Sequence, residues 1–170
     1  YGLVGSEMCI RDRYTGLICL SNNIPGTTAL SSKFSNSFFI EGNNIQEYKR
    51  NLDEITKIHR TTGEIIWRWG GSQNQFEFTN DYPFTHQHTL RCLGDNKYLL
   101  FDNGNFSSQY TGLPNYSRAV EYELDIQNMT CTKTWEYTHP DFLFTPSIGS
   151  THRLPNGNTL IDFANLQLLE

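Results

Sequence analysis

Two histidines one residue apart, His86 and His88, stand at the start of an apolar segment of the chain. The next apolar segment runs into residues 102–105, with the sequence Asp-Asn-Gly-Asn. An imidazole can act near neutral pH as a general acid or base, and it can also act as a nucleophile. Neighbouring amide groups can stabilise charge that develops on a group being transferred. These residue types therefore indicate acid–base or group-transfer chemistry.

Two other interpretations of the histidine pair stay open at this stage. A His-x-His pair can bind a metal ion, but a third ligand would have to come from another part of the chain. The two imidazoles could also hydrogen-bond only to the local backbone. The four cysteines lack the Cys-x-x-Cys spacing of a zinc site. Cys92 and Cys131 fall in strand-like segments and are expected to be buried free thiols, with a disulfide as the alternative.

The segments that carry these residues belong to a repeat of short hairpins. Each copy has an apolar stretch, a turn rich in Gly, Asp or Asn, and a second apolar stretch. The Asn-Gly turn at residues 156–157 is the strongest of these hairpin signals. Trp67 and Trp135 occupy matching positions in two copies. The expected hairpins cover residues 54–69, 88–100, 119–137 and 150–161.

A recurring hairpin pair predicts an all-β fold, and specifically a partial β-propeller with about two to three four-stranded antiparallel blades. A β-sandwich is the alternative, although sandwiches do not repeat a hairpin pair internally. In an antiparallel hairpin the start of one strand lies beside the end of the next. His86 and His88 should therefore lie near Asp102, Asn103 and Asn105, at the rim of a blade. An incomplete propeller would expose apolar residues, including Ile65, Trp67 and Leu160.

The composition argues against some classes of partner. A formal net charge of −5 and a pI near 5.5 disfavour binding to nucleic acid or to an anionic membrane surface. No apolar run is long enough to span a bilayer, and no signal peptide is visible. The sequence does not indicate an oligomeric state.

The first 13 residues follow no periodic pattern. They resemble the conceptual translation of sequencing-adapter DNA, so we interpret residues 1–13 as non-native. Residues 14–170 are then expected to be a fragment of one β-propeller domain, truncated at both ends.

An ordered series of short motifs runs from about residue 51 to residue 161. The motifs are Asp-Glu-Ile-Thr-Lys-Ile at 53–58, Thr-Gly-Glu-Ile-Ile-Trp-Arg-Trp-Gly-Gly at 62–71, Gln-His at 87–88, Leu-Phe-Asp-Asn-Gly-Asn at 100–105, Ser-Arg-Ala-Val-Glu-Tyr at 117–122, Trp-Glu-Tyr at 135–137 and Leu-Pro-Asn-Gly-Asn-Thr-Leu-Ile at 154–161. No single motif is decisive, but the ordered set resembles the bacterial arylsulfotransferase (aryl-sulfate sulfotransferase) family.

The resemblance implies a six-bladed propeller that is exported to the periplasm or the cell surface. It also implies transfer of a sulfuryl group from an aryl sulfate to a phenol through a sulfohistidine, with no nucleotide sulfate donor and no cofactor. The chemistry fits the residue types, because a neutral imidazole can attack sulfur while amide or cationic donors hold the sulfuryl oxygens.

The resemblance also assigns site residues. His88 matches the histidine of the family's Gln-His motif and is the predicted catalytic residue. Asn103 and Asn105 are expected to support it in substrate binding. Arg118 could supply positive charge for catalysis, or could equally pair with an acidic residue.

The remaining histidines are weaker candidates. We expect His86 and His152 to contribute at most to substrate binding. His59 falls in an outer hairpin and is expected to be solvated. His139 follows the Trp-Glu-Tyr motif in a loop and is expected to be structural.

The chain departs from the family pattern in its first part. The family usually carries a His-x-Asn-Ser segment one blade earlier, and here residues 34–37 read Phe-Ser-Asn-Ser, with Phe34 in place of the histidine. The apolar alternation also fails across residues 46–48. These departures motivate a second hypothesis, a non-catalytic propeller that serves as a binding or scaffold module. They also predict that the fragment alone is inactive.

Overall fold

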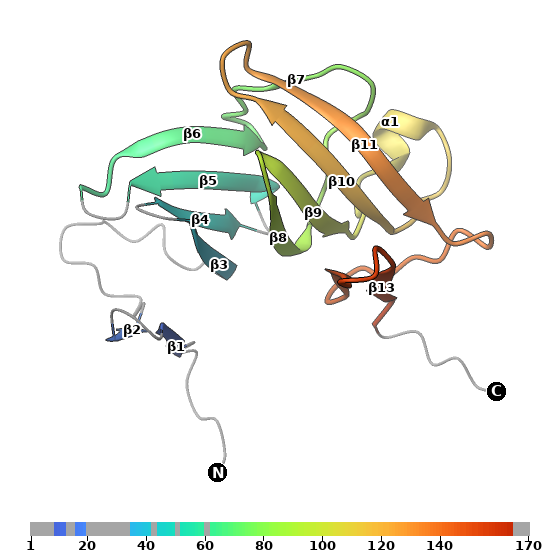
Figure 1. Cartoon of the computed structure of the whole chain (residues 1–170). Helices are drawn as coiled ribbons and strands as arrows, with labels where there is room; N and C mark the ends of the chain where they lie inside the picture. Colours follow the sequence, from blue (N-terminus) through green and yellow to red (C-terminus); the bar gives the residue numbers. More distant parts are fainter. Residues whose placement is uncertain are drawn as a thin grey trace. The chain divides into compact units, whose positions relative to one another are not determined.

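The computed structural model describes residues 9–12, 16–19, 35–41, 44–49, 52–59 and 62–164, and describes side chains for 52–59 and 62–164. The described chain is mostly β-strand, which confirms the all-β prediction (Figure 1). The one α-helix among the described residues is α1 (Ser108–Thr111), which the sequence analysis did not predict.

The chain divides into two compact units, Tyr1–Ser32 and Lys33–Glu170. In the first unit, β1 (Cys9–Asp12) and β2 (Gly16–Cys19) form an antiparallel hairpin. The interpretation of residues 1–13 as non-native stays a prediction. Phe34 lies outside the described residues.

The second unit begins with a four-stranded antiparallel sheet. Its strands follow chain order: β3 (Ser35–Glu41), β4 (Asn44–Lys49), β5 (Glu54–His59) and β6 (Ile65–Gly70). The predicted 54–69 hairpin is confirmed as β5 and β6. Strand β4 includes residues 46–48 and pairs with both neighbours, so the backbone forms a strand there although the apolar alternation fails.

The second sheet has five strands, β7 (Glu77–Phe78), β8 (His88–Gly94), β9 (Lys97–Asp102), β10 (Arg118–Asp125) and β11 (Thr130–Thr138). Their spatial order is β7-β11-β10-β9-β8. The pairs are antiparallel except for β7, a two-residue strand that runs parallel to β11. The hairpins at 88–100 and 119–137 are confirmed, and β7 was not predicted.

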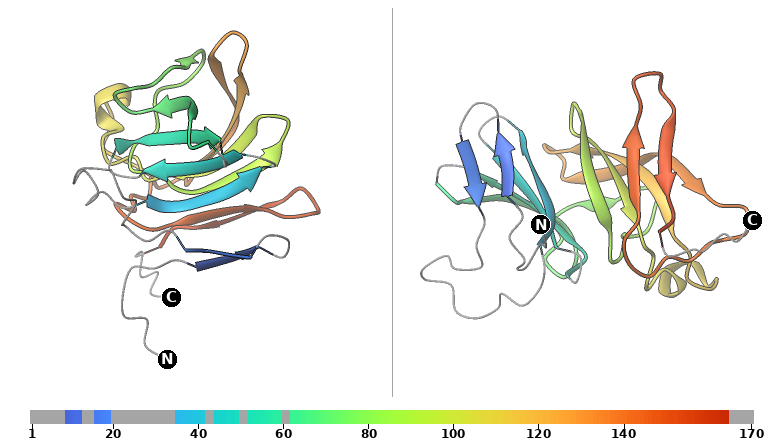
Figure 2. Two further views of the ribbon diagram at one scale, coloured as in Figure 1. Left: turned by 90° about the vertical axis from the view of Figure 1, so that its left-hand side faces the viewer. Right: turned by 90° about the horizontal axis from the view of Figure 1, so that it is seen from below.

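A separate hairpin follows, formed by β12 (Ser150–Arg153) and β13 (Thr159–Asp162), and it confirms the prediction at 150–161 (Figure 2). Among the described residues, no helix has the length and apolar character needed to cross a membrane.

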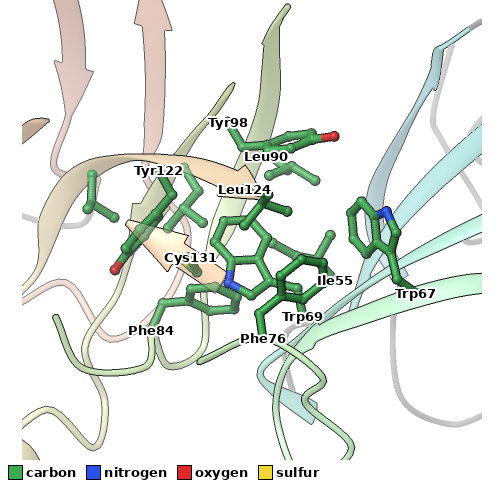
Figure 3. Close-up of a cluster of buried hydrophobic side chains, with 12 residues drawn as sticks. Ile55, Trp67, Trp69, Phe76, Phe84, Leu90, Tyr98, Tyr122, Leu124 and Cys131 are labelled. Carbon is green, nitrogen blue, oxygen red and sulfur yellow. The ribbon is translucent and has the colours of Figure 1, made fainter. Parts of the chain in front are cut away.

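The core joins the two larger sheets through aromatic side chains (Figure 3). Trp69 of β6 packs edge to face on Phe84 and on Tyr122 of β10, with ring centroids 4.9 and 5.3 Å away. Such pairs each add about 0.5–1.5 kcal/mol beyond the burial of apolar area. The buried core consists of Ile55, Trp67, Trp69, Phe76, Phe84, Leu90, Tyr98, Leu100, Val120, Tyr122, Leu124 and Cys131.

One sequence expectation about side-chain exposure needs correction. Trp67 is buried, not exposed, because Phe76 from the loop after β6 and Tyr98 of β9 pack on its ring. Ile65 and Leu160 are exposed, as expected. Cys92 and Cys131 do not form a disulfide, in agreement with the expected thiols, and Cys131 is buried while Cys92 is partly buried.

Candidate active site

His88 is the first residue of β8 and pairs with Phe101, near the end of β9. This antiparallel register brings the histidine next to the loop that follows β9, as the sequence predicts. The Nδ1 atom of His88 lies 2.5 Å from Oδ1 of Asn103, which is fully buried. The structure therefore joins the two residues that the family resemblance placed together.

The contacts of Asn103 determine which nitrogen of His88 carries the proton. Nδ2 of Asn103 donates to the carbonyl oxygens of Thr145 and Ile148, at 2.6 and 2.8 Å. The amide oxygen must then face His88, and because an oxygen of this kind only accepts, Nδ1 is the protonated nitrogen. Nε2 keeps its lone pair, which accepts a long hydrogen bond of 3.3 Å from the Ile148 backbone N–H.

The backbone around His88 is strained. His86, Thr89 and Ile148, and Asp53 beside His86, all have positive φ angles, of 55°, 51°, 66° and 54°. For residues other than glycine such angles are uncommon, and for a β-branched residue like isoleucine they are a true outlier. Strain of this kind costs on the order of 1–3 kcal/mol per residue and clusters at functional sites. Its concentration here supports the assignment of a site.

Gly149 closes the loop that covers His88. Its φ is +99°, and a Cβ atom at this position would lie 2.4 Å from the Phe101 ring. Its carbonyl oxygen accepts a hydrogen bond of 3.0 Å from the Thr89 hydroxyl. The absence of a side chain therefore lets the loop approach β9 closely enough for the Ile148 N–H to reach His88.

His86 is held by a carboxylate. Its backbone N–H donates to Oδ1 of Asp53, and its ring Nδ1 lies 3.2 Å from the same oxygen. The imidazole also packs edge to face on Phe106, with ring centroids 5.0 Å apart. Its side chain is 18% exposed, so the ring can be reached from outside.

Asp102 anchors the loop that carries Asn103. Its Oδ1 accepts the backbone N–H groups of Thr85 and Gly104, at 2.9 and 3.0 Å, and its Oδ2 accepts Nε of Arg118 at 2.9 Å. Burial raises the pKa of Asp102, although Arg118 and these N–H donors oppose the rise. The Asp102 carboxylate therefore holds the segment before β8 and the segment after β9 together.

Arg118 lies in a buried charged cluster. Only 1% of its side chain is exposed, and it pairs with Asp81 at 3.0 Å and Glu136 at 3.1 Å as well as with Asp102. The guanidinium also stacks on the ring of Tyr82, 4.0 Å from the centroid. Burial lowers the pKa of Arg118, but the surrounding groups raise it well above its ordinary value. These contacts match the acidic-partner alternative, and a catalytic role for Arg118 stays a prediction.

The structure places the other two predicted substrate-binding residues, Asn105 and His152, differently. Oδ1 of Asn105 is buried with no hydrogen-bond partner, while the Asn105 backbone oxygen accepts from Asn115 at 2.6 Å. His152 lies on β12, paired with Leu160, and its side chain is exposed. Substrate binding by either residue stays a prediction.

Two parts of the site were missed in the sequence. Asp53 belongs to a recognised motif but gave no sign of its contact with His86, 33 residues later. The loop at residues 145–149, Thr-Pro-Ser-Ile-Gly, carries a visible turn signal in its Pro and Gly. That signal marks a loop but does not reveal that the loop covers His88.

Other reactive groups are less suited to catalysis. Burial raises the pKa of the Cys131 thiol, so it stays protonated and is a poor nucleophile. Within the part of the chain whose side chains are described, no three His, Cys, Asp or Glu residues gather as a metal ion would need.

Comparison with known families identifies the chain. The sequence model of the arylsulfotransferase (ASST) family matches residues 36–170. The chain therefore belongs to the arylsulfotransferase family, which the ordered motifs predicted. No curated protein sequence matches it.

Proposed function

We propose that this chain supplies part of the active site of an aryl-sulfate sulfotransferase, in which Nε2 of His88 accepts the sulfuryl group. The observation that carries the proposal is the defined tautomer of His88. Asn103 holds the proton on Nδ1, and Nε2 keeps an unshared electron pair. An unprotonated imidazole nitrogen is the nucleophile that a sulfohistidine requires.

In the first half of the reaction, Nε2 of His88 attacks the sulfur of an aryl sulfate. The N–S bond forms, the S–O bond to the aryl group breaks, and the bonding pair leaves on the phenolate. The N–H of Ile148 now contacts Nε2 at 3.3 Å, a long distance for a hydrogen bond. Once displaced from Nε2, this N–H would lie beside the sulfuryl oxygens and could donate to them.

Asn103 would stabilise the product of this step more than the reactant. A sulfuryl group on Nε2 gives the ring cationic character and makes Nδ1–H a stronger donor. The hydrogen bond to Oδ1 of Asn103 then becomes charge-assisted, and such bonds are roughly twice as strong as neutral ones. Interactions that strengthen during the reaction are the ones that raise the rate.

We also propose that the two larger sheets and the β12–β13 hairpin are successive blades of a propeller, six-bladed as in the family. The support is that antiparallel sheets follow one another in chain order. A periplasmic or cell-surface location follows from family membership alone. The substrates would be an aryl sulfate and a phenol, with no nucleotide donor.

The test uses the full-length protein, with 4-nitrophenyl sulfate as donor and a phenol as acceptor. His88→Ala should lower the rate of phenol-dependent nitrophenolate release by at least about 100-fold, because the nucleophile is gone. His59→Gln is the matched control, because the His59 ring hydrogen-bonds to Thr62 of its own turn, away from His88 in the fold, and should be dispensable.

Two outcomes would contradict the proposal. An unchanged rate in His88→Ala would remove His88 from the chemistry. A folded full-length wild type that transfers no sulfuryl group from any aryl sulfate would favour the non-catalytic binding or scaffold module.

A further inference from the structure

The second half of a sulfuryl transfer needs a proton acceptor. A phenol attacks the sulfohistidine through its oxygen and must lose its hydroxyl proton. His88 cannot take this proton, because its Nε2 carries the sulfuryl group and its Nδ1 is already protonated. Another base near His88 is therefore required.

We propose that His86, oriented by Asp53, is the general base for the acceptor phenol. The inference rests on the proposed function and extends it to a second catalytic residue. Asp53 contacts both the backbone N–H and the ring Nδ1 of His86 through one oxygen. Nδ1 lies 3.2 Å from this oxygen without hydrogen-bond geometry, but the negative charge of Asp53 beside it favours the proton on Nδ1 and leaves the lone pair on Nε2.

The position of His86 suits this role. Only Gln87 separates it from His88, so the two Cα atoms lie within about 7 Å of each other. Both imidazoles contact the same loop after β9, His88 through Asn103 and His86 through Phe106. One phenol could therefore reach both rings.

Several features keep His86 in place. Its φ of 55° turns the chain immediately before β8. Gln87 is fully buried, and its Nε2 donates to the backbone oxygen of Glu54 at 3.2 Å. The segment before β8 is thus fastened to the start of β5 by two successive residues, His86 through Asp53 and Gln87 through Glu54. Phe106 is 45% exposed and offers an apolar surface beside the His86 ring for the ring of a phenol.

The second half of the reaction transfers the sulfuryl group from His88 to the phenol. The phenol oxygen forms a bond to sulfur, and the bond between sulfur and Nε2 of His88 breaks. The bonding pair returns to Nε2 of His88, which regains its neutral form. The phenol proton moves to Nε2 of His86, and the resulting imidazolium faces the Asp53 carboxylate. In the next cycle His86 returns this proton to the phenolate that leaves the donor.

The experiment separates the two halves of the reaction in the full-length protein. With 4-nitrophenyl sulfate the leaving phenolate is stable without a proton, so a rapid burst of nitrophenolate reports the first half. His86→Gln should therefore still show a burst. It should lower turnover by about 100-fold with weakly acidic phenols, which need the base. The loss should shrink steadily as the acceptor phenol becomes more acidic.

Asp53→Asn provides a second, milder variant. The amide oxygen can still accept the His86 backbone N–H, but it no longer carries the charge that stabilises the imidazolium. We expect a smaller loss of turnover with the same dependence on acceptor acidity. The matched controls are His139→Gln and Asp141→Asn, because these residues form another Asp–His contact, at 3.7 Å, that we do not assign to the site. Both controls should behave as wild type.

The outcomes distinguish this inference from the proposed function. A normal burst with an equal loss for every acceptor would show that His86 is not the base. Full turnover in His86→Gln would show the same. Absence of a burst in the wild type would instead overturn the sulfohistidine at His88.

Discussion

Asp102 and Asn103 are neighbours in sequence, yet their side chains enter two very different polar networks. Asp102 joins a buried cluster in which Arg118 is matched by several carboxylates. Asn103 joins a neutral network that ends at His88, where Nε2 keeps its lone pair and accepts a long hydrogen bond from the Ile148 N–H. Paired buried charges stabilise the fold, whereas an imidazole whose tautomer is fixed and whose Nε2 keeps its lone pair can react.

The two networks also hold different parts of the site in place. The Asp102 carboxylate fixes the backbone of residues 85 and 104, on either side of the site. The Asn103 amide then fixes the loop at 145–148 and the tautomer of His88. Removing a member of the first network should therefore affect stability most, and removing a member of the second should affect catalysis most.

The largest expected effect is on stability, in Arg118→Met. The substitution leaves the Asp102 carboxylate buried without its cation and leaves Asp81 with Lys133 alone, which should lower the free energy of unfolding by about 3–5 kcal/mol. Urea unfolding of the full-length protein, followed by tryptophan fluorescence, measures it. Lys97→Met is the control, because the contact of Lys97 with Glu123 is exposed and 3.9 Å long. Similar effects in both variants would show that the buried cluster does not hold the fold.

The next effect is on catalysis, in Asn103→Ala. Without Oδ1 the tautomer of His88 is no longer fixed, and kcat should fall by roughly 100-fold. The control is Thr145→Val, which keeps the backbone oxygen that Asn103 binds and removes a hydroxyl that has no hydrogen-bond partner. Steady-state kinetics with a saturating acceptor measure both. A kcat in Asn103→Ala close to that of the control would remove Asn103 from the mechanism.

The smallest effect compares two glycines. Gly149 and Gly157 both have positive φ, of +99° and +87°, but a Cβ atom would collide with Phe101 only at Gly149. Gly149→Ala should cost about 1–3 kcal/mol of stability and lower kcat, since the loop over His88 must shift. Gly157→Ala, where no atom lies within 4 Å, should cost less and leave kcat unchanged. Thermal unfolding and turnover of both variants test the close approach, and equal costs would argue against it.

The sequence predicted the hairpins well because their signals are local. Alternating apolar residues and turns such as Asn156-Gly157 report strand pairs a few residues apart. The same local logic placed His88 beside Asn103, since an antiparallel hairpin brings the start of one strand next to the end of its partner.

The sequence could not predict contacts between distant segments. Asp53 reaches His86 across 33 residues, and Asn103 reaches Ile148 across 45. Such contacts depend on how the sheets pack. Burial of Trp67 by Phe76 was missed for a similar reason, because Phe76 lies in a loop outside the repeating pattern. The role of Arg118 could not be predicted from its residue type alone, since a positive charge suits either catalysis or an ion pair.

The most direct test of the central claim is to locate the sulfuryl group on the protein. The full-length protein is mixed with a ³⁵S-labelled aryl sulfate in the absence of acceptor, and the labelled peptide is identified by mass spectrometry. We predict a label on His88 that is lost when a phenol is added and is absent from His88→Ala. A stable label on a different residue, still present in His88→Ala, would contradict the account.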